Sequence, residues 1–188
     1  ACTDKAAMRE AWDRCGVPQP AFRVTESLDQ AVAAVEDIGL PVICKPAKSI
    51  AGGSRGVSIV KTSDELERAF EFARSVYDDD SRMLIEECVT GSEHSVEVVI
   101  RDSSPEVVAV SDKEKTPPPY RVDKSVIYPT ASEQRRTIEK TAADAVRAKG
   151  IETGAAHVEL AVTESGPRLF ELGARCGGGA TADPIIPA

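Results

Sequence analysis

The chain has 188 residues, 41% of them hydrophobic, and a net charge of −8 at pH 7. This length can bury a core as one domain or as two small ones, and the acidic balance argues against binding to nucleic acid or to an anionic membrane. No apolar run approaches the roughly 20 residues of a membrane span, and five scattered cysteines without a Cys-x-x-Cys motif indicate reduced thiols, so we expect a cytoplasmic protein.

Residues 1–84 predict a compact lobe of helices and strands. Helical periodicity follows capping signals at Thr3, at Ser27-x-x-Gln30 and at Thr62-x-x-Glu65. Short apolar runs predict strands at 22–24, 41–46 and 57–60. Lys45 lies among apolar residues in one of these strands, and a lysine in such surroundings requires a negatively charged partner. We therefore expect an acid close to Lys45.

The loop between two of these strands, AKSIAGGSRG, is rich in glycine. Gly52, Gly53 and Ser54 offer backbone N–H groups and a hydroxyl that can surround an anion. The loop lacks the Gly-Lys-Ser/Thr ending of a Walker P-loop and the spacing of a Rossmann motif, so neither fold is supported. An ordinary surface loop remains the alternative.

Residues 85–188 predict a second lobe that is richer in strands. Strands are expected at 83–89, 93–100 and 107–111, with a linker at Thr90-Gly91. The stretch DKEKTPPPYRVDKS, residues 112–125, is charged and rich in proline, which predicts a long surface loop. A further capping box, from Thr130 to Glu133, predicts a helix that ends near Gly150.

Residues 154–179 predict a hairpin that brings two acids together. If Glu164-Ser165-Gly166 is a three-residue loop, Thr163 pairs with Pro167 and Glu159 lies opposite Glu171. Two carboxylates at this spacing share a proton or need a cation between them, and oxygen ligands suit Mg²⁺ or Mn²⁺. Arg175, four residues further on, can hold a phosphate or a carboxylate. The alternative is a hairpin whose acids point into water.

Assembled in order, these pieces resemble the ATP-grasp superfamily over essentially the whole chain. The resemblance is carried by TDKAAMREAWDRCGVPQP, by LPVICKP with the glycine loop behind it, by LIEECVTGSEHSVEV and by HVELAV…RLFELGAR. It implies an α+β fold in which two α/β lobes, residues 1–84 and 85–188, hold ATP between them. Members of this family use ATP to activate a carboxylate as an acyl phosphate, which an amine or another nucleophile then attacks.

The resemblance also implies roles for individual residues. Lys5, Lys45, Gly52, Gly53 and Ser54 match the phosphate-binding positions. Glu86, Glu87 and Val89 lie in the segment that matches the adenine-binding hinge, and Glu93 matches the ribose-binding acid. Glu159 and Glu171 match the metal ligands, and Arg175, together with Lys45, is expected to assist the chemistry of the acyl phosphate.

The ending Glu-Leu-Gly-Ala-Arg has Gly173 where many members have asparagine. It resembles the branch that contains L-amino acid (dipeptide) ligases and related carboxylate–amine ligases. In that branch the long loop supplies a glutamate and, three residues later, a histidine, whereas this chain has Asp123 and Val126. Asp123 is the implied ligand of a second metal ion, and the missing histidine leaves the acceptor amine open.

We therefore expect the core of an ATP- and Mg²⁺-dependent ligase that joins a small-molecule carboxylate to an amine. A carbamoyl-phosphate-synthase-like or carboxylase-like enzyme and a non-catalytic nucleotide-binding module are the alternatives. Whole family members carry an N-terminal lobe and further C-terminal chain, so we expect a fragment of a larger enzyme, and the resemblance leaves a homodimer open.

Overall fold

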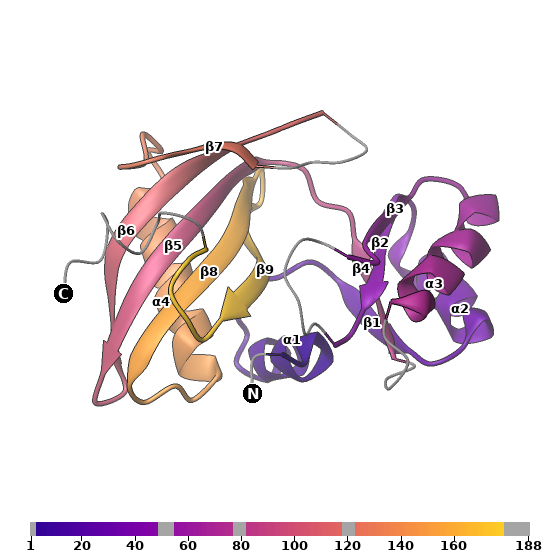
Figure 1. Ribbon diagram of the computed structural model, residues 1–188, viewed down its shortest axis with the longest axis horizontal. Helices are drawn as coiled ribbons and strands as arrows, with labels where there is room; N and C mark the ends of the chain where they lie inside the picture. The colour runs from indigo at the N-terminus through magenta and orange to yellow at the C-terminus, as the bar shows by residue number, and fades with distance from the viewer. Residues whose placement is uncertain (1–2, 49–54, 77–81, 118–122, 179–188) are drawn as a thin grey trace. The chain divides into compact units, whose positions relative to one another are not determined.

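A computed structural model describes residues 3–48, 55–76, 82–117 and 123–178. The chain divides into two compact units, one formed mainly by Thr3–Arg9 and Pro20–Cys88 and the other mainly by Glu10–Gln19 and Val89–Ala188. Helix α1 (Lys5–Arg14) contributes residues to both units. Each unit contains one antiparallel sheet and helices (Figure 1), which confirms the predicted α+β class.

The first unit is a four-stranded sheet with two helices on one face. Its strands, in the order β1-β4-β2-β3, are β1 (Phe22–Thr25), β4 (Met83–Glu87), β2 (Val42–Pro46) and β3 (Ser58–Val60). Helices α2 (Leu28–Ile38) and α3 (Leu66–Ser75) pack on Met83 and Ile85, whereas Ala6 of α1 packs on Leu84. Because successive side chains of a strand alternate between faces, α1 lies on the sheet face opposite α2 and α3.

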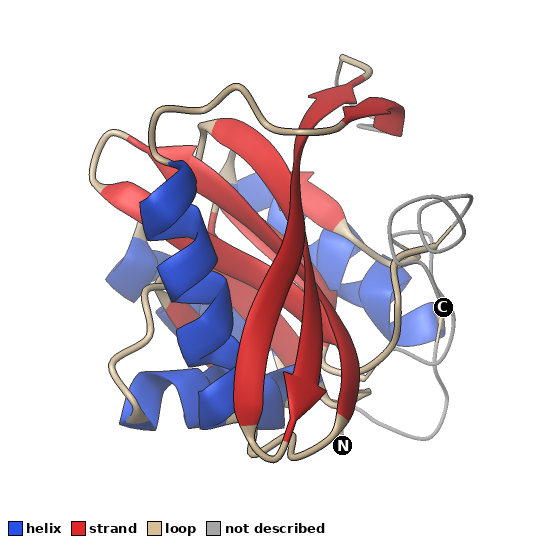
Figure 2. Cartoon of the chain, turned by 90° about the vertical axis from the view of Figure 1, so that its left-hand side faces the viewer, coloured by secondary structure: helices blue, strands red, loops and turns tan. Residues whose placement is uncertain are grey.

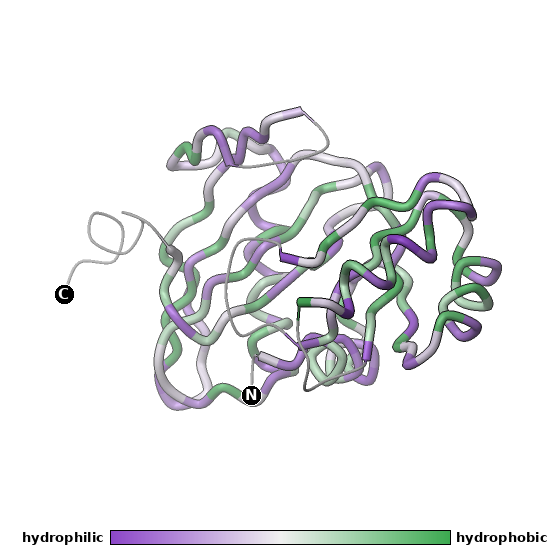
Figure 3. The backbone as a smooth tube through the Cα atoms, turned by 45° about the vertical axis from the view of Figure 1, so that its right-hand side comes forward, coloured by the Kyte–Doolittle hydropathy of each residue, from purple (hydrophilic) through white to green (hydrophobic). Residues whose placement is uncertain are grey.

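The second unit is a five-stranded sheet covered on one face by α4 (Arg135–Ala148), as Figure 2 shows. The strands, in the order β7-β6-β5-β8-β9, are β7 (Asp123–Ile127), β6 (Ser104–Lys115), β5 (Ser92–Arg101), β8 (Gly154–Thr163) and β9 (Gly166–Gly173). Hydrophobic and hydrophilic residues alternate along these strands (Figure 3). Val96, Val158 and Leu172 are buried and share one face, which leaves Ser95, Glu97, His157 and Glu159 on the other, polar face.

Of the first three predicted helix caps, one agrees with the structure and two differ. Ser27 caps α2 by accepting a hydrogen bond from the backbone N–H of Gln30 at 3.3 Å, as predicted. In α1 the cap is Asp4 rather than Thr3, because Oδ1 of Asp4 accepts the N–H of Ala7 at 2.9 Å. Thr62 makes no side-chain cap, and a short 3-10 turn, η1 (Ser63–Glu65), precedes α3. Among the helices of the described residues, none is long and apolar enough to span a membrane.

The predicted capping box at Thr130 is wrong. Helix α4 begins at Arg135, and the hydroxyl of Thr130 donates to Oδ1 of Asp112 at 2.5 Å. The other oxygen of Asp112 accepts the N–H of Ala131 at 2.9 Å. An ionised carboxylate is a stronger acceptor than a hydroxyl, so Asp112 fixes the turn at Thr130 and Ala131, whereas Gln134, which precedes α4, makes no side-chain cap.

The predicted surface loop at residues 112–125 is also wrong at both of its ends. Strand β6 continues through Lys115, and β7 begins at Asp123. Lys113 and Lys115 fall on the same face of β6 and form ion pairs with carboxylates of other strands. Their charges are therefore neutralised within the sheet, and both ends of a stretch whose composition is typical of a solvated loop belong to strands.

Candidate nucleotide and metal site

The two acids of the hairpin meet as predicted, although the hairpin closes differently. Glu159 and Glu171 are cross-strand partners in β8 and β9. Thr163 pairs with Gly166, so the loop has two residues and the predicted three-residue loop is wrong. A bulge next to Glu159 leaves Phe170 without a partner and shifts the register by one residue. The bulge compensates for the shorter loop, and the two acids therefore share one face of the sheet.

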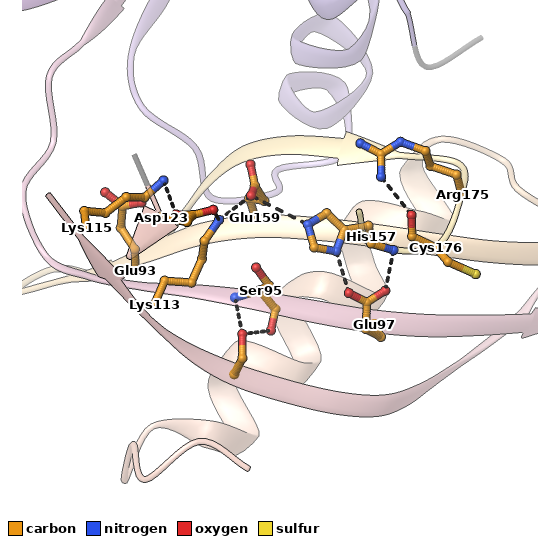
Figure 4. A network of polar contacts seen from close by, with 12 residues as sticks. Glu93, Ser95, Glu97, Lys113, Lys115, Asp123, His157, Glu159, Arg175 and Cys176 are labelled. Carbon is orange, nitrogen blue, oxygen red and sulfur yellow. Dashed lines mark hydrogen bonds and ion pairs between the residues drawn. The ribbon is translucent and has the colours of Figure 1, made fainter. Parts of the chain in front are cut away.

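The side chains of Lys113 and His157 contact Glu159 on the polar face of the second unit (Figure 4). Nζ of Lys113 forms an ion pair with Oε1 of Glu159, and Nε2 of His157 lies 3.6 Å from the same oxygen. Burial alone would raise the pKa of the Glu159 carboxyl, but the contacts with His157 and Lys113 hold it well below its usual range. Glu159 is therefore a carboxylate at neutral pH, as a metal ligand must be.

Two further predicted residues, Glu93 and Asp123, lie in the same ionic network. Nζ of Lys115 lies 3.3 Å from Oε2 of Glu93 and 2.8 Å from Oδ1 of Asp123. The other oxygen of Asp123 lies 3.1 Å from Nζ of Lys113. Both oxygens of Asp123 are thus paired with lysines, and its role as a second metal ligand stays a prediction.

A buried glutamate that the sequence reasoning missed lies beside this network. Glu97 of β5 is fully buried, and its Oε1 lies 2.6 Å from Nδ1 of His157. Its Oε2 accepts the backbone N–H of Gly177 at 3.1 Å. The predicted Arg175 lies between the end of β9 and this contact, and its guanidinium donates to the carbonyl oxygen of Cys176 at 2.8 Å. The alternation of Glu93, Ser95 and Glu97 in β5 is the signal that could have placed Glu97 on the polar face.

The donors on the polar face fit a magnesium ion. Glu159 and Glu171 supply carboxylate oxygens, the ligand type that Mg²⁺ prefers. Within the described ranges, no group of three or more His, Cys, Asp or Glu side chains is arranged to hold a metal ion. Mg²⁺ is often bound through one or two carboxylates together with waters and substrate phosphates, so a pair of acids is a sufficient protein contribution.

In the first unit, Lys45 has the acidic partner that the sequence predicts. Nζ of Lys45 lies 2.7 Å from Oε2 of Glu86, and Nε of Arg9 lies 2.9 Å from Oε1 of the same residue. All three are buried on the face of the sheet that α1 covers. Sequence reasoning missed Arg9, which adds a second positive charge to this buried triad.

Burial and charge determine the ionisation of the triad. Burial alone would raise the pKa of the Glu86 carboxyl, but Arg9 and Lys45 lower it to about 2. Burial lowers the pKa of Lys45 to about 8, with Arg9 and Lys5 adding to that effect and Glu86 opposing it. Lys45 is therefore predominantly protonated at pH 7, as a phosphate ligand must be.

Some of the remaining predicted residues of the first unit lie in the described structure, and others lie outside it. Lys5 is buried in the first turn of α1, and its backbone N–H donates to the carbonyl oxygen of Ala47 at 2.7 Å. In the predicted hinge, the N–H groups of Glu87 and Cys88 donate to Ala21 and Pro41 at 2.9 and 3.2 Å. Gly52, Gly53 and Ser54 lie outside the described residues. The nucleotide contacts of Lys5, Glu86, Glu87 and Val89 stay predictions.

The buried triad predicts that acid destabilises the chain. Glu86 has a pKa of about 2 in the folded chain and 4.5 as its reference value, so its stabilising effect is present above pH 4.5 and is lost as the pH falls toward 2. From pH 7 to pH 3 the free energy of unfolding of the wild type should fall by about 2 kcal/mol more than that of Glu86→Gln. Urea unfolding of both proteins at the two pH values measures this difference. Equal acid losses would contradict the ionised state of Glu86.

A two-sheet α+β chain with this strand order, a buried lysine–glutamate pair and a hairpin bearing two acids has the ATP-grasp fold. Its structure is similar to a crystal structure of L-amino acid ligase from Bacillus licheniformis, with a TM-score of 0.80 and 26% identity over 98% of this chain and 43% of that one. The chain belongs to the family described as "Carbamoyl-phosphate synthase L chain, ATP binding domain", whose model matches residues 4–177. The predicted ATP-grasp resemblance is thereby confirmed.

Two curated relatives of this chain are longer proteins. The carbamoyl phosphate synthase large chain of Methanothrix thermoacetophila is 30% identical over 92% of this chain and 16% of its own length. The vancomycin/teicoplanin A-type resistance protein VanA of Enterococcus faecium is 32% identical over 88% of this chain and 50% of its own length. The chain thus spans half or less of each of these proteins.

Proposed function

We propose that the chain is the nucleotide-binding and catalytic core of an ATP- and Mg²⁺-dependent ligase that activates a carboxylate as an acyl phosphate for attack by an amine. The observation that carries this proposal is the cross-strand pairing of Glu159 and Glu171 on the polar face of the second unit. Membership of a family of ATP-binding domains and the likeness to an L-amino acid ligase support it.

The cationic residues of the first unit bind the nucleotide phosphates in this proposal. Lys45 is fixed by Glu86, which limits the number of conformations that its ammonium group can adopt. The positive charges of Lys45 and Lys5 stabilise the negative charge that develops on the phosphoryl oxygens during transfer. Gly52, Gly53 and Ser54 would add backbone and hydroxyl donors to the same phosphates. In the hinge, the backbone of Glu86, Glu87 and Val89 binds the adenine.

The polar face of the second unit binds the metal ion and the ribose. Glu159 and Glu171 would hold Mg²⁺, or Mn²⁺, which supplies charge neutralisation at the phosphates, and Asp123 would assist at a second ion. Glu93 accepts hydrogen bonds from the ribose hydroxyls. The guanidinium of Arg175 stabilises the oxyanion of the acyl phosphate, where loss of one donor typically costs about 3 kcal/mol of barrier.

The acceptor amine is expected to meet an apolar surface near β7. Val126 is paired with Lys113, so it lies on the polar face, and 40% of its surface is exposed. A valine offers no polar group to an amine, unlike the histidine of similar ligases. We therefore propose that the acceptor meets the apolar side chain of Val126 here, while Asp123, paired with Lys113 and Lys115, keeps its proposed role at the second ion.

A second candidate function is phosphorylation of bicarbonate or carbamate. The family description and the 30% identical relative, both of carbamoyl-phosphate synthase, favour it. The same groups would serve in this reaction, because bicarbonate and carbamate are themselves carboxylate-like acceptors of a phosphoryl group. The two functions differ in the acceptor of the phosphoryl group and in the need for an amine.

Release of ADP tests the proposal. The chain, together with any longer protein that contains it, is incubated with Mg²⁺-ATP and a panel of carboxylates, with and without amines. We expect ADP release that requires a carboxylate and increases with an amine, and its loss in Lys45→Met. Dependence on bicarbonate would favour the second candidate. ATP binding without any ADP release that a carboxylate, an amine or bicarbonate stimulates would overturn both and leave the non-catalytic nucleotide-binding module.

A further inference from the structure

The chain beyond β9 turns back across the polar face of the sheet. Strand β9 ends at Gly173, and β8 lies between β9 and β5 in the sheet. Four residues later, the N–H of Gly177 donates to Oε2 of Glu97, which belongs to β5. The segment 174–177 therefore spans β8 and is fixed at its far end by Glu97. Arg175 lies within this segment.

The side chain of Glu97 is buried and contacts other residues of the chain rather than solvent. Its side chain has no exposed surface, and each of its oxygens has a partner at hydrogen-bond distance. A buried carboxylate is costly unless it is hydrogen-bonded, so a Glu97 without Gly177 and His157 would destabilise the fold. His157 in turn lies 3.6 Å from Glu159, which connects this contact with the acid pair.

Gly177 has no space for a side chain. A Cβ atom at this position would lie 2.5 Å from Oε1 of Glu97 and 2.9 Å from Nδ1 of His157. Any side chain would have to push the segment away from β5 or displace the buried pair. At the adjacent Gly178, by contrast, nothing lies within 4 Å of a Cβ. The absence of a side chain is thus required at one of the two glycines, and Gly178 provides a matched control.

We propose that Glu97 is a positioning residue that places Arg175 through the backbone of Gly177. The proposal rests on the proposed function, in which Arg175 stabilises the acyl phosphate. Gly177 lies two residues after Arg175, and the guanidinium donates to the carbonyl oxygen of Cys176 between them. Fixing the N–H of Gly177 therefore also fixes the carbonyl group that orients the guanidinium. Misplacement of a catalytic group by about 1 Å can cost about 100-fold in rate.

Steady-state kinetics of Gly177→Ala and Gly178→Ala test the proposal. We expect Gly177→Ala to lower kcat for carboxylate-dependent ADP release about 100-fold, with KM for ATP changed less than about threefold. Gly178→Ala should resemble the wild type. Equal kcat values for the two variants, or a loss confined to KM for ATP, would overturn the proposal.

The acid itself is tested by two substitutions of different chemistry. Glu97→Gln keeps an oxygen that can accept the N–H of Gly177, and its amide can donate to a neutral ring nitrogen of His157. Glu97→Met fills similar space without any acceptor. We expect Glu97→Met to lose kcat as Gly177→Ala does and Glu97→Gln to lose much less. Folding of each variant is checked by urea unfolding, and an equal loss of kcat in two folded variants would contradict a hydrogen-bonding role.

A double-mutant cycle separates positioning of Arg175 from a general structural role. In an Arg175→Ala background, adding Gly177→Ala should change kcat less than about threefold, because the group that Gly177 positions is already absent. Multiplication of the two losses would show that Gly177 acts independently of Arg175 and would overturn the proposal.

Amide hydrogen exchange distinguishes failure of this inference from failure of the proposed function, because it requires no ATP or activity. We expect the Gly177 amide of the wild type to exchange at least about 10-fold more slowly than that of Gly178. Equal exchange rates would overturn the contact whatever the enzyme does. Slow exchange at Gly177 without carboxylate-dependent ADP release would retain the contact, refute the proposed function and refute the role of Glu97 in catalysis.

Discussion

Glu86→Gln is expected to destabilise the chain by about 3–5 kcal/mol. The substitution leaves the ammonium of Lys45 and the guanidinium of Arg9 buried beside an uncharged amide, whereas the wild type places Glu86 2.7 and 2.9 Å from them. Desolvation of each cation is then no longer offset by an opposite charge. The glutamine keeps the shape of the side chain, so the loss reports the charge.

The ion pair of Arg23 with Asp37 in the same unit is the matched control. More than half of each side chain is exposed, so Asp37→Asn should cost at most about 1 kcal/mol. Urea unfolding at pH 7, followed by circular dichroism, gives both values under one condition. A loss in Glu86→Gln no larger than that in Asp37→Asn would contradict the buried triad.

Replacement of Glu171 by glutamine is expected to have the largest effect on ligand binding. In our proposal Glu171 is one of two protein ligands of the metal, paired across the strands with Glu159. Loss of a group that only supports a metal ligand typically costs 10-fold to 100-fold in affinity, so loss of a ligand should cost about 100-fold or more. Glu164→Gln, an exposed acid in the turn of the same hairpin, is the matched control.

The acidic pair was predictable because two strands with a period of two residues leave few registers. The short loop and the bulge at Phe170 were not, because Glu164-Ser165-Gly166 is compatible with both loop lengths. A three-residue loop in a regular ladder and a two-residue loop with one bulge give the same partner for Glu159. The predicted pairing of Glu159 with Glu171 was therefore correct, although the predicted loop length was wrong.

The sequence predicts that the partner of Lys45 is an acid, but it does not predict which acid. A buried lysine requires an acid, yet the acid lies on β4, 41 positions further along the chain. Arg9 was missed because arginine on a helix is usually solvated. A signal was present, since Lys5 and Arg9 are like charges four residues apart, an arrangement that destabilises an exposed helix. Two such cations on one helix face indicate a shared anion.

The charged stretch at 112–125 was interpreted as a loop because its composition is typical of solvated chain. Lys113 and Lys115 instead contact Glu159, Asp123 and Glu93, which come from three other strands. Such ion pairs form only when the sheet is assembled, so the sequence around each lysine does not predict them. The same holds for Glu97, whose partners are His157 and Gly177, 60 and 80 positions away.

Isothermal titration calorimetry of Mg²⁺-ATP with the wild type and Glu171→Gln tests the central claim most directly, with titrations in EDTA to separate the metal-dependent affinity. We predict that the wild type binds Mg²⁺-ATP far more tightly than metal-free ATP, and that Glu171→Gln loses this difference while Glu164→Gln keeps it. Wild-type affinity for Mg²⁺-ATP in Glu171→Gln would show that the paired acids do not hold the metal ion.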